Sequence, residues 1–239
     1  MQAIILAGGK GRRLQPYTTV IPKPLMPIGD YPILDIILKQ LKRAGVSEVI
    51  LAVGHMSHLF QAFFQDGRQY GLEIVYSFEK KALGTAGPIA LAMDRLRDNF
   101  LVMNGDLLTT LNFANLYKQH MAMRSAATVG MYPRQVKIDF GVVEVDGSNR
   151  LVRYIEKPTY DFSVSMGINA FNKEWVKPFL IPGEYLDIPD LLMKMQQEGL
   201  VVQCYSEACY WLDIGRIDDY HTANEIFEAK RAEFLPGEA

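Results

Sequence analysis

The chain has 239 residues, of which 49% are hydrophobic and 22% are charged, an ordinary composition for a globular protein. Its formal net charge of −2 gives no electrostatic support for nucleic-acid binding or for attachment to a membrane surface. Cys204 and Cys209 are too few for a disulfide framework, and their spacing matches no zinc motif. No apolar run approaches the ~18 residues of a membrane span, and no basic segment precedes the first apolar run, so we expect a cytoplasmic protein.

The first half of the chain alternates short apolar runs with longer amphipathic ones. Apolar residues at spacings of three and four predict helices over 33–44, 59–64 and 89–96. Strands that alternate with helices are typical of right-handed βαβ units, which form a mostly parallel sheet covered on both faces. We therefore expect an α/β fold in which helices sandwich a mostly parallel, mixed sheet. The predicted strands cover 3–7, 49–53, 72–78 and 100–103.

The second half is less regular, but it contains no linker, repeat or low-complexity tract. Asp146-Gly147 is a turn signal between two predicted strands and favours a hairpin. The absence of a boundary predicts a single α/β domain over residues 1–239. Predicted strands cover 126–132, 141–145, 151–156 and 164–171, and predicted helices cover 113–123, 173–180, 188–198 and 217–234.

A glycine-rich segment directly follows the first predicted strand. Its glycines let the backbone approach a ligand closely and present N–H groups to an anion. Basic side chains alternate with them, and a further lysine follows between two prolines that restrict the backbone. A polyphosphate site needs point cations as well as backbone donors, so this segment predicts phosphate binding. The glycines are Gly8, Gly9 and Gly11, and the cations are Lys10, Arg12, Arg13 and Lys23.

Two better-known phosphate loops do not fit this segment. The dinucleotide-binding pattern requires a glycine where Leu14 stands, and no Lys-Ser or Lys-Thr pair follows as in a P-loop. Taken alone, the segment is equally compatible with a glycine turn that carries solvated basic residues.

Two motifs stand close together here: Ala-Gly-Gly-x-Gly-x-Arg-Leu-x-Pro over residues 7–16 and Pro-Lys-Pro-Leu-x-Pro over 22–27. They resemble the sugar-1-phosphate nucleotidyltransferases, a family that includes the NDP-sugar pyrophosphorylases. The resemblance implies a Rossmann-like, GT-A-like fold. Arg12 departs from the pattern, which usually has threonine there, and it adds a cation. The resemblance implies that Arg13 and Lys23 bind phosphates and that the loop backbone, from Leu6 and Ala7 onward, holds the nucleoside.

Two aspartates follow apolar runs in the manner of residues at strand ends. Asp106 ends the triplet Asn-Gly-Asp over 104–106, and Asp213 lies in Trp-Leu-Asp-Ile-Gly over 211–215. An aspartate after a strand is more often a turn or cap residue. Both contexts, however, match metal-binding motifs of the same family, and Mg²⁺ bound with nucleotide takes one or two protein carboxylates. The resemblance thus implies that Asp106 and Asp213 hold Mg²⁺, and that Gly105 contacts the sugar.

The triplet Glu156-Lys157-Pro158 resembles a sugar-binding motif of the family. The resemblance implies that the carboxylate accepts hydrogen bonds from sugar hydroxyls and that the ammonium reaches the sugar phosphate. The alternative is a surface ion pair at a strand end. Gly141 matches a glycine whose backbone meets the sugar in this family.

Residues 165–169 occupy the place of another sugar-binding segment of the family, in which Gly167 and Asn169 would contact the sugar. Two positions depart from the pattern. Ser165 stands where asparagine is common, and Asn169 stands where an aromatic residue is common. The identity of the sugar is therefore left open.

The run Leu-Gly-Thr-Ala-Gly-Pro over 83–88 resembles the base-reading loop of the family. Its sequence resembles that of the mannose-1-phosphate guanylyltransferases most closely. Gly84 and Thr85 would lie against the nucleobase, although Thr85 could instead cap the following helix. Glu79 lies just upstream, and a carboxylate complements guanine, which offers two donors. GTP is the favoured substrate, and the alternative is that Glu79 is a solvated residue.

Together these motifs predict an enzyme that joins an NTP to a hexose or heptose 1-phosphate, with mannose 1-phosphate favoured, and releases pyrophosphate. The resemblance divides the domain into a nucleotide-binding half, 1–125, and a sugar-phosphate-binding half, 126–239. We expect no left-handed β-helix after these motifs, no nucleic-acid partner and no membrane partner. The sequence is compatible with a monomer or a homo-oligomer.

Four alternatives remain open. A uridylyl-, thymidylyl- or cytidylyltransferase could use the same motifs on another sugar 1-phosphate. A cytidylyltransferase for a phosphorylated alcohol shares the opening motif, although Glu156, Lys157 and Gly141 favour a sugar. A glycosyltransferase would ordinarily need an Asp-x-Asp motif, and Asn104 stands at its first position. A non-catalytic sugar-nucleotide-binding subunit would not require every phosphate and metal residue.

Overall fold

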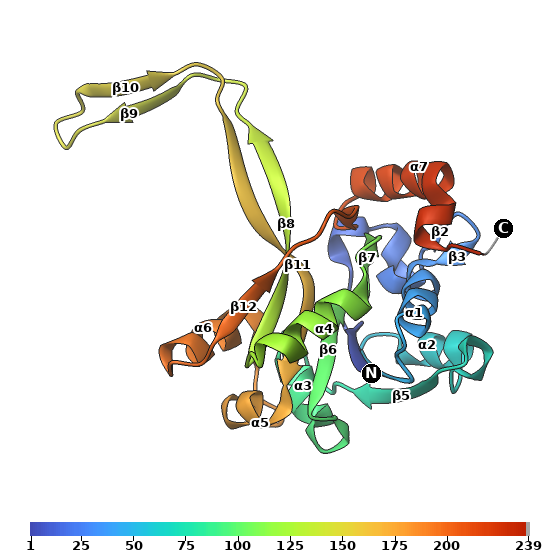
Figure 1. The fold of residues 1–239 in the computed structure, drawn as a ribbon. Coiled ribbons are helices and arrows are strands. Elements are labelled where there is room, and N and C mark those ends of the chain that lie inside the picture. Colours follow the sequence, from blue (N-terminus) through green and yellow to red (C-terminus); the bar gives the residue numbers. More distant parts are fainter. Residues whose placement is uncertain (238–239) are drawn as a thin grey trace.

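A seven-stranded mixed sheet runs through the molecule, and the computed structural model describes residues 1–237 of the chain (Figure 1). The last four strands in its order are parallel to one another, as the βαβ pattern predicts. β11 is antiparallel to both of its neighbours, which makes the sheet mixed and confirms the predicted fold class. In spatial order the strands are β12 (Val202–Tyr205), β8 (Ala127–Lys137), β11 (Thr159–Asn172), β6 (Asn99–Asn104), β1 (Gln2–Leu6), β4 (Glu48–Val53) and β5 (Glu73–Phe78).

Helices cover both faces of the sheet because its central strands are apolar on both sides. In β1, Ala3 and Ile5 face one core, whereas Ile4 faces the other. This explains why the central strands are continuous apolar runs and show no alternation with polar residues. The first core includes α1 (Ile33–Arg43), α2 (Ser57–Phe64), α4 (Phe113–Met123) and α7 (Ile217–Phe234), and the second includes α3 (Gly87–Ala92), α5 (Lys173–Val176) and α6 (Ile188–Gln197).

The helices predicted over 113–123 and 217–234 have the same bounds in the structure. The helix predicted over 173–180 is shorter: α5 ends at Val176 and a 3₁₀ turn, Lys177–Phe179, follows it. Pro178 lies in that turn and lacks the N–H that an α-helix would need. None of the helices described between residues 1 and 237 is long and apolar enough to cross a lipid bilayer.

Several very short strands have no counterpart among the predictions. β2 (Pro27–Ile28) pairs with β3 (Tyr31–Pro32), and β7 (Leu107–Thr109) pairs with β13 (Trp211–Asp213). Two or three residues carry too little periodicity to be recognised as strands. The β7–β13 pair nevertheless joins segments about one hundred residues apart at the edge where the functional residues lie.

β8 and β11 continue their pairing well beyond the sheet, from Met131 opposite Ser165 to Lys137 opposite Thr159. The hairpin of β9 (Val142–Val145) and β10 (Leu151–Ile155) follows at the far end of this ribbon. We call residues 131–165 the arm. It projects away from the body of the molecule (Figure 1).

Candidate active site

A pocket of about 490 Å³ opens at the carboxyl ends of β1 and β6 and beside the segment that follows β5. Parallel strands place their carboxyl ends along one edge of the sheet, which is where ligands of such folds bind. The pocket therefore gathers segments that are distant in the sequence. Its lining consists of Leu6, Ala7, Gly8, Gly9, Gly11, Arg12, Arg13, Lys23, Pro24, Glu79, Ala82, Leu83, Gly84, Thr85, Pro88, Asn104, Asp106, Tyr185 and Gly215.

The glycine-rich segment forms one wall of this pocket, and two of its glycines are required by the local geometry. Gly11 has φ of +60° and its carbonyl accepts a hydrogen bond of 2.8 Å from the Thr18 hydroxyl. A side chain there would be strained, because β-carbons are disfavoured at this φ. At Gly8 a β-carbon would lie 2.5 Å from Oε1 of Glu79. The glycine-rich segment and Glu79, which follows β5, are therefore in close contact at Gly8.

Lys23 lies at the floor of the pocket, and only 6% of it is exposed. Its ammonium forms a close ion pair with Asp106 and lies 3.7 Å from Oδ1 of Asp213. Burial, and then the charge of nearby Asp106, raise the pKa of the Asp213 carboxyl above its usual value. The structure thus brings the predicted lysine and both predicted aspartates into one charged cluster.

The β7–β13 pair explains how Asp213 reaches Asp106. Asp213 lies opposite Leu107 in this antiparallel pair, and the backbone N–H of Ile214 donates to the carbonyl of Asp106 at 3.2 Å. The two carboxylates therefore converge from segments that a short ladder holds side by side. Within residues 1–237 no cluster of three or more histidine, cysteine or acidic side chains could hold a metal ion.

The other predicted cations differ in position. Arg12 and Arg13 both line the pocket, and a β-carbon at Gly215 would lie 3.4 Å from a guanidinium nitrogen of Arg13. Gly215 thus leaves the space in which the Arg13 side chain lies. Lys10 is exposed and lies outside the lining of this pocket.

At the other end of the pocket, Oε2 of Glu79 accepts a hydrogen bond of 3.3 Å from the N–H of Leu83. Burial raises the pKa of Glu79, and this hydrogen bond partly offsets the effect. Thr85 does not cap the following helix, because the N-cap of α3 is Ala86, which makes no side-chain cap bond. Instead Thr85 bonds to the segment that precedes α6.

Three of the predicted sugar contacts lie away from the other predicted site residues. Gly141, Glu156 and Lys157 belong to the arm, and both charged side chains are exposed. Lys157 has φ of +44°, which is uncommon for a residue with a side chain. All three lie outside the lining of the pocket.

The remaining predicted sugar contacts lie at the root of the arm or below the pocket. At Gly167, with φ of +69°, a β-carbon would lie 2.6 Å from Nδ2 of Asn104, a residue of the pocket wall. Asn169 is buried in β11, and its Oδ1 has no hydrogen-bond partner in the described part of the chain. Gly105 is buried, and its N–H donates to the Leu6 carbonyl at 3.0 Å.

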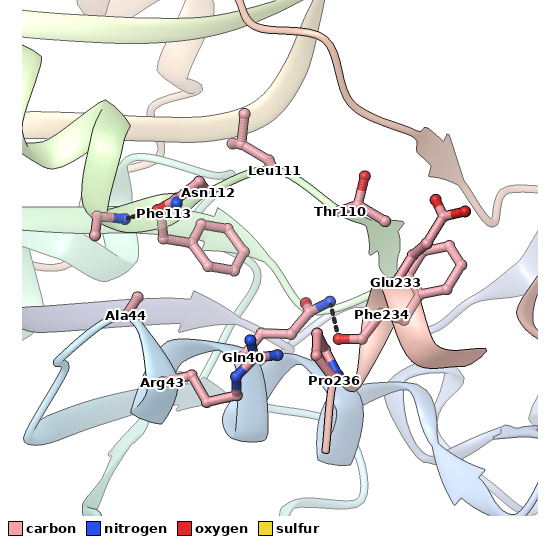
Figure 2. Close-up of a pocket in the computed structure, with 11 residues that line it drawn as sticks. Gln40, Arg43, Ala44, Thr110, Leu111, Asn112, Phe113, Glu233, Phe234 and Pro236 are labelled. Atoms are coloured by element: carbon pink, nitrogen blue, oxygen red, sulfur yellow. Dashed lines mark hydrogen bonds between the residues drawn. The ribbon is translucent and has the colours of Figure 1, made fainter. Parts of the chain in front are cut away.

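A second pocket of about 240 Å³ contains none of the predicted functional residues (Figure 2). It lies between α1, the start of α4 and the end of α7. The Gln40 amide crosses it and donates to the carbonyls of Thr109 and Phe234 at 2.8 and 3.1 Å. These hydrogen bonds hold α7 against the rest of the molecule, so the polar groups in this pocket have a structural role.

Sequence reasoning missed two residues of the first pocket that offer chemistry. Asn104 precedes the Gly-Asp motif. The sequence marks it only as the residue that stands where an Asp-x-Asp motif would have its first carboxylate. Tyr185 lies in an irregular loop before α6, where no periodicity or motif marks it. Its place in the pocket follows from the packing of that loop against residues 83–87.

Residues 2–230 match the family model described as Nucleotidyl transferase. A UTP–glucose-1-phosphate uridylyltransferase from Synechocystis is 32% identical, over 93% of this chain and 62% of that protein. The catalytic subunit beta of mannose-1-phosphate guanylyltransferase from Danio rerio is 34% identical, over 93% of this chain and 63% of that protein. The chain therefore spans less than two thirds of the length of these relatives.

Among solved structures, a protein described as a glucose-1-phosphate thymidylyltransferase from Bacillus anthracis has a similar fold. Its TM-score is 0.76 at 26% identity, and the match covers 95% of this chain and 94% of that one. The three similar proteins are named for three different nucleotides, so the names alone do not select the base.

Proposed function

Because the chain belongs to the nucleotidyl transferase family, we propose that it transfers a nucleoside monophosphate from an NTP to a sugar 1-phosphate. GTP and mannose 1-phosphate are the favoured pair. The single observation that carries this proposal is the pocket that Arg12, Arg13, Lys23 and Asp106 share with the glycine-rich loop. Backbone donors and cations at one wall suit a polyphosphate, and the opposite end has room for a base.

In the proposed reaction an oxygen of the sugar 1-phosphate attacks the α-phosphorus of the NTP. A P–O bond forms there, and the bond from the α-phosphorus to the oxygen that bridges to the β-phosphorus breaks. Pyrophosphate leaves with that electron pair. The nucleophile is already anionic near neutral pH because the second pKa of a phosphate is about 6, so no strong general base is needed.

Catalysis would rest on position and charge. Arg13 and Lys23 would bind the β- and γ-phosphates and stabilise the leaving pyrophosphate. Lys157 would reduce the repulsion between the two anionic phosphates, and Glu156 would accept hydrogen bonds from sugar hydroxyls. For Glu156 and Lys157 to act in this way, the arm must approach the pocket that would hold the NTP.

Members of this family generally use a divalent metal, and we propose Mg²⁺. Asp106 and Asp213 fit such an ion because Mg²⁺ takes one or two carboxylates and completes its shell with phosphate oxygens and water. A divalent cation held by these residues would relieve the charge repulsion from Asp106 that helps to raise the pKa of Asp213. When bound there, the ion would neutralise charge on the phosphate oxygens.

The choice of GTP rests on Glu79. Its carboxylate lies in the pocket at the base-reading loop and offers acceptors to the two donors on the guanine edge. Uracil and thymine present one N–H and would satisfy it less well.

The test is a matrix of reactions. The protein is incubated with Mg²⁺, each of GTP, UTP, dTTP and CTP, and a panel of hexose and heptose 1-phosphates, and pyrophosphate release is measured. We expect turnover with GTP. Absence of turnover with every pair would refute the enzyme proposal, and turnover with UTP but not GTP would refute the role of Glu79.

A further inference from the structure

The loop before α6 is joined to the base-reading loop by a compact set of backbone hydrogen bonds. The N–H of Leu186 donates to the carbonyl of Leu83 at 3.0 Å. In return, the carbonyl of Leu186 accepts from the N–H groups of Ala86 and Gly87 at 2.8 and 3.2 Å. The two loops therefore form one unit at the base end of the pocket, although about a hundred residues separate them.

Side-chain hydrogen bonds between Thr85 and the residues that begin α6 hold this unit together. Asp187 occupies the N-cap position of α6 but makes no cap bond to that helix. Instead its Oδ1 accepts from the backbone N–H and the hydroxyl of Thr85, at 3.0 and 3.1 Å. The Thr85 hydroxyl in turn accepts from the N–H of Ile188 at 2.8 Å and so caps α6 from the other loop.

The same aspartate also fixes a tyrosine that lines the pocket. The Tyr185 hydroxyl donates to Oδ2 of Asp187 at 2.7 Å, so each carboxylate oxygen serves a different loop. Tyr185 is 63% exposed although its hydroxyl is anchored. An exposed aromatic ring interacts only weakly with water, so little interaction energy is lost when a ligand covers it. Because the ring is already fixed in position, the entropy cost of binding a flat ligand is lower.

The neighbours of Tyr185 in the pocket define what such a ligand would be. Ala82, Leu83, Gly84 and Pro88 are apolar or lack side-chain donors, and they share this end of the pocket with Tyr185. The cations that line the same pocket, Arg12, Arg13 and Lys23, belong to the segment that follows β1. A molecule with a planar aromatic part at one end and several phosphates at the other matches this distribution of groups.

We propose that the Tyr185 ring is a nucleobase contact, and that Asp187 is a positioning residue that holds both this ring and the base-reading loop. The ligand class is a nucleoside triphosphate, and the inference rests on the proposed function only for that choice. Base–aromatic stacking is sequence-tolerant, because every base has an aromatic face. Tyr185 should therefore contribute affinity for all NTPs, whereas Glu79 contributes selectivity among them.

The experiment measures binding directly, by calorimetry, for GTP and for inorganic tripolyphosphate, which lacks a base. Tyr185→Ala should weaken GTP binding by about 10-fold or more and leave tripolyphosphate binding unchanged. Tyr185→Phe keeps the ring but loses the anchor, so its loss should be smaller. Asp187→Ala should raise the KM for GTP more than it lowers kcat, and it too should spare tripolyphosphate.

Ile181→Ala is the matched control, because Ile181 is an exposed apolar residue of the same connecting segment that lies outside the pocket lining. Thermal unfolding of each variant separates a local effect from a loss of folding. GTP affinity in Tyr185→Ala equal to that of the wild type would overturn the inference. Equal losses for GTP and tripolyphosphate would overturn it as well, and so would a wild type that binds no NTP. A wild type that binds GTP but turns over no sugar phosphate would refute the proposed function alone.

Discussion

The phosphate end of the pocket and the arm are built in opposite ways. Lys23 is 6% exposed and lies in the pocket near the carboxyl ends of β1 and β6. Each of these central strands pairs with a neighbouring strand on both sides. The arm is a two-stranded ribbon, and its apolar side chains remain in solvent: Phe140 is 78% and Leu151 65% exposed. Two-stranded hairpins are marginally stable alone, whereas a central parallel strand is fixed by its ladder and by two cores. The proposed phosphate-binding end of the pocket is therefore preorganised, whereas the proposed sugar contacts on the arm depend on where the arm lies.

The first prediction concerns Asp213→Asn, in the charged cluster of Lys23 and the two aspartates. If the phosphate end carries the chemistry, loss of this carboxylate should lower kcat by roughly 10³-fold, as removal of a preorganised charge-stabilising group does. Stability should be unchanged or slightly higher, because burial and Asp106 already disfavour the charged form of Asp213. Pyrophosphate release and thermal unfolding measure the two quantities. Asp218→Asn, at an exposed position of α7, is the control and should change neither.

The second prediction concerns the end of the sheet that lies away from the pocket, where β6 and β8 begin. His120 is buried, with Nδ1 2.9 Å from the Thr128 hydroxyl and Nε2 3.1 Å from Oδ1 of Asn99, so it joins β8 to β6. Burial lowers its pKa from 6.5 to about 4. Between these values the unfolded chain binds the extra proton, so stability is complete above pH 6.5 and falls as the pH drops toward 4.

The expected loss over this range is about 3 kcal/mol. Urea unfolding at several pH values measures it. His120→Gln removes the titrating ring and should flatten this part of the pH profile. An identical profile in the variant would show that groups other than His120 dominate acid destabilisation.

Lys157→Met tests whether the arm takes part in the reaction at all. If Lys157 reaches the sugar phosphate, kcat/KM for the sugar phosphate should fall by about 10- to 100-fold, the worth of a hydrogen bond to a charged group. GTP affinity and melting temperature should stay constant, because the side chain is exposed and lies outside the pocket lining. Lys137→Met, also exposed on the arm, is the control. Unchanged kinetics in Lys157→Met would separate the arm from catalysis.

The smallest expected effect is at the base end. Glu79→Gln keeps the shape of the side chain but replaces one acceptor with a donor. The ratio of kcat/KM for GTP to that for UTP should fall by about 10-fold, the cost of one unmatched hydrogen bond. Competition between the two nucleotides in one reaction measures this ratio. A ratio that stays constant would locate base selection elsewhere in the pocket.

The strand pattern brings the residues of one end of the pocket together because parallel strands leave few choices. Residues that follow β1, β5 and β6 must meet at one sheet edge, so Arg13, Glu79 and Asp106 can be grouped from the strand pattern alone. The route of Asp213 to this edge could not be predicted, because β7 and β13 are too short to leave a pattern. The direction of the arm was equally unpredictable, since nothing in an antiparallel ribbon fixes where its far end points. Tyr185 was missed because its position follows from hydrogen bonds between two irregular loops.

The ion pair of Lys23 with the two aspartates also affects how the protein folds. Two carboxylates brought together at the ends of separate segments would repel each other without a counter-ion. Lys23 provides that counter-ion from within the chain. A newly made polypeptide can therefore complete this corner of its fold before it meets a metal or a nucleotide. A chelator should accordingly abolish turnover and leave the folded state intact.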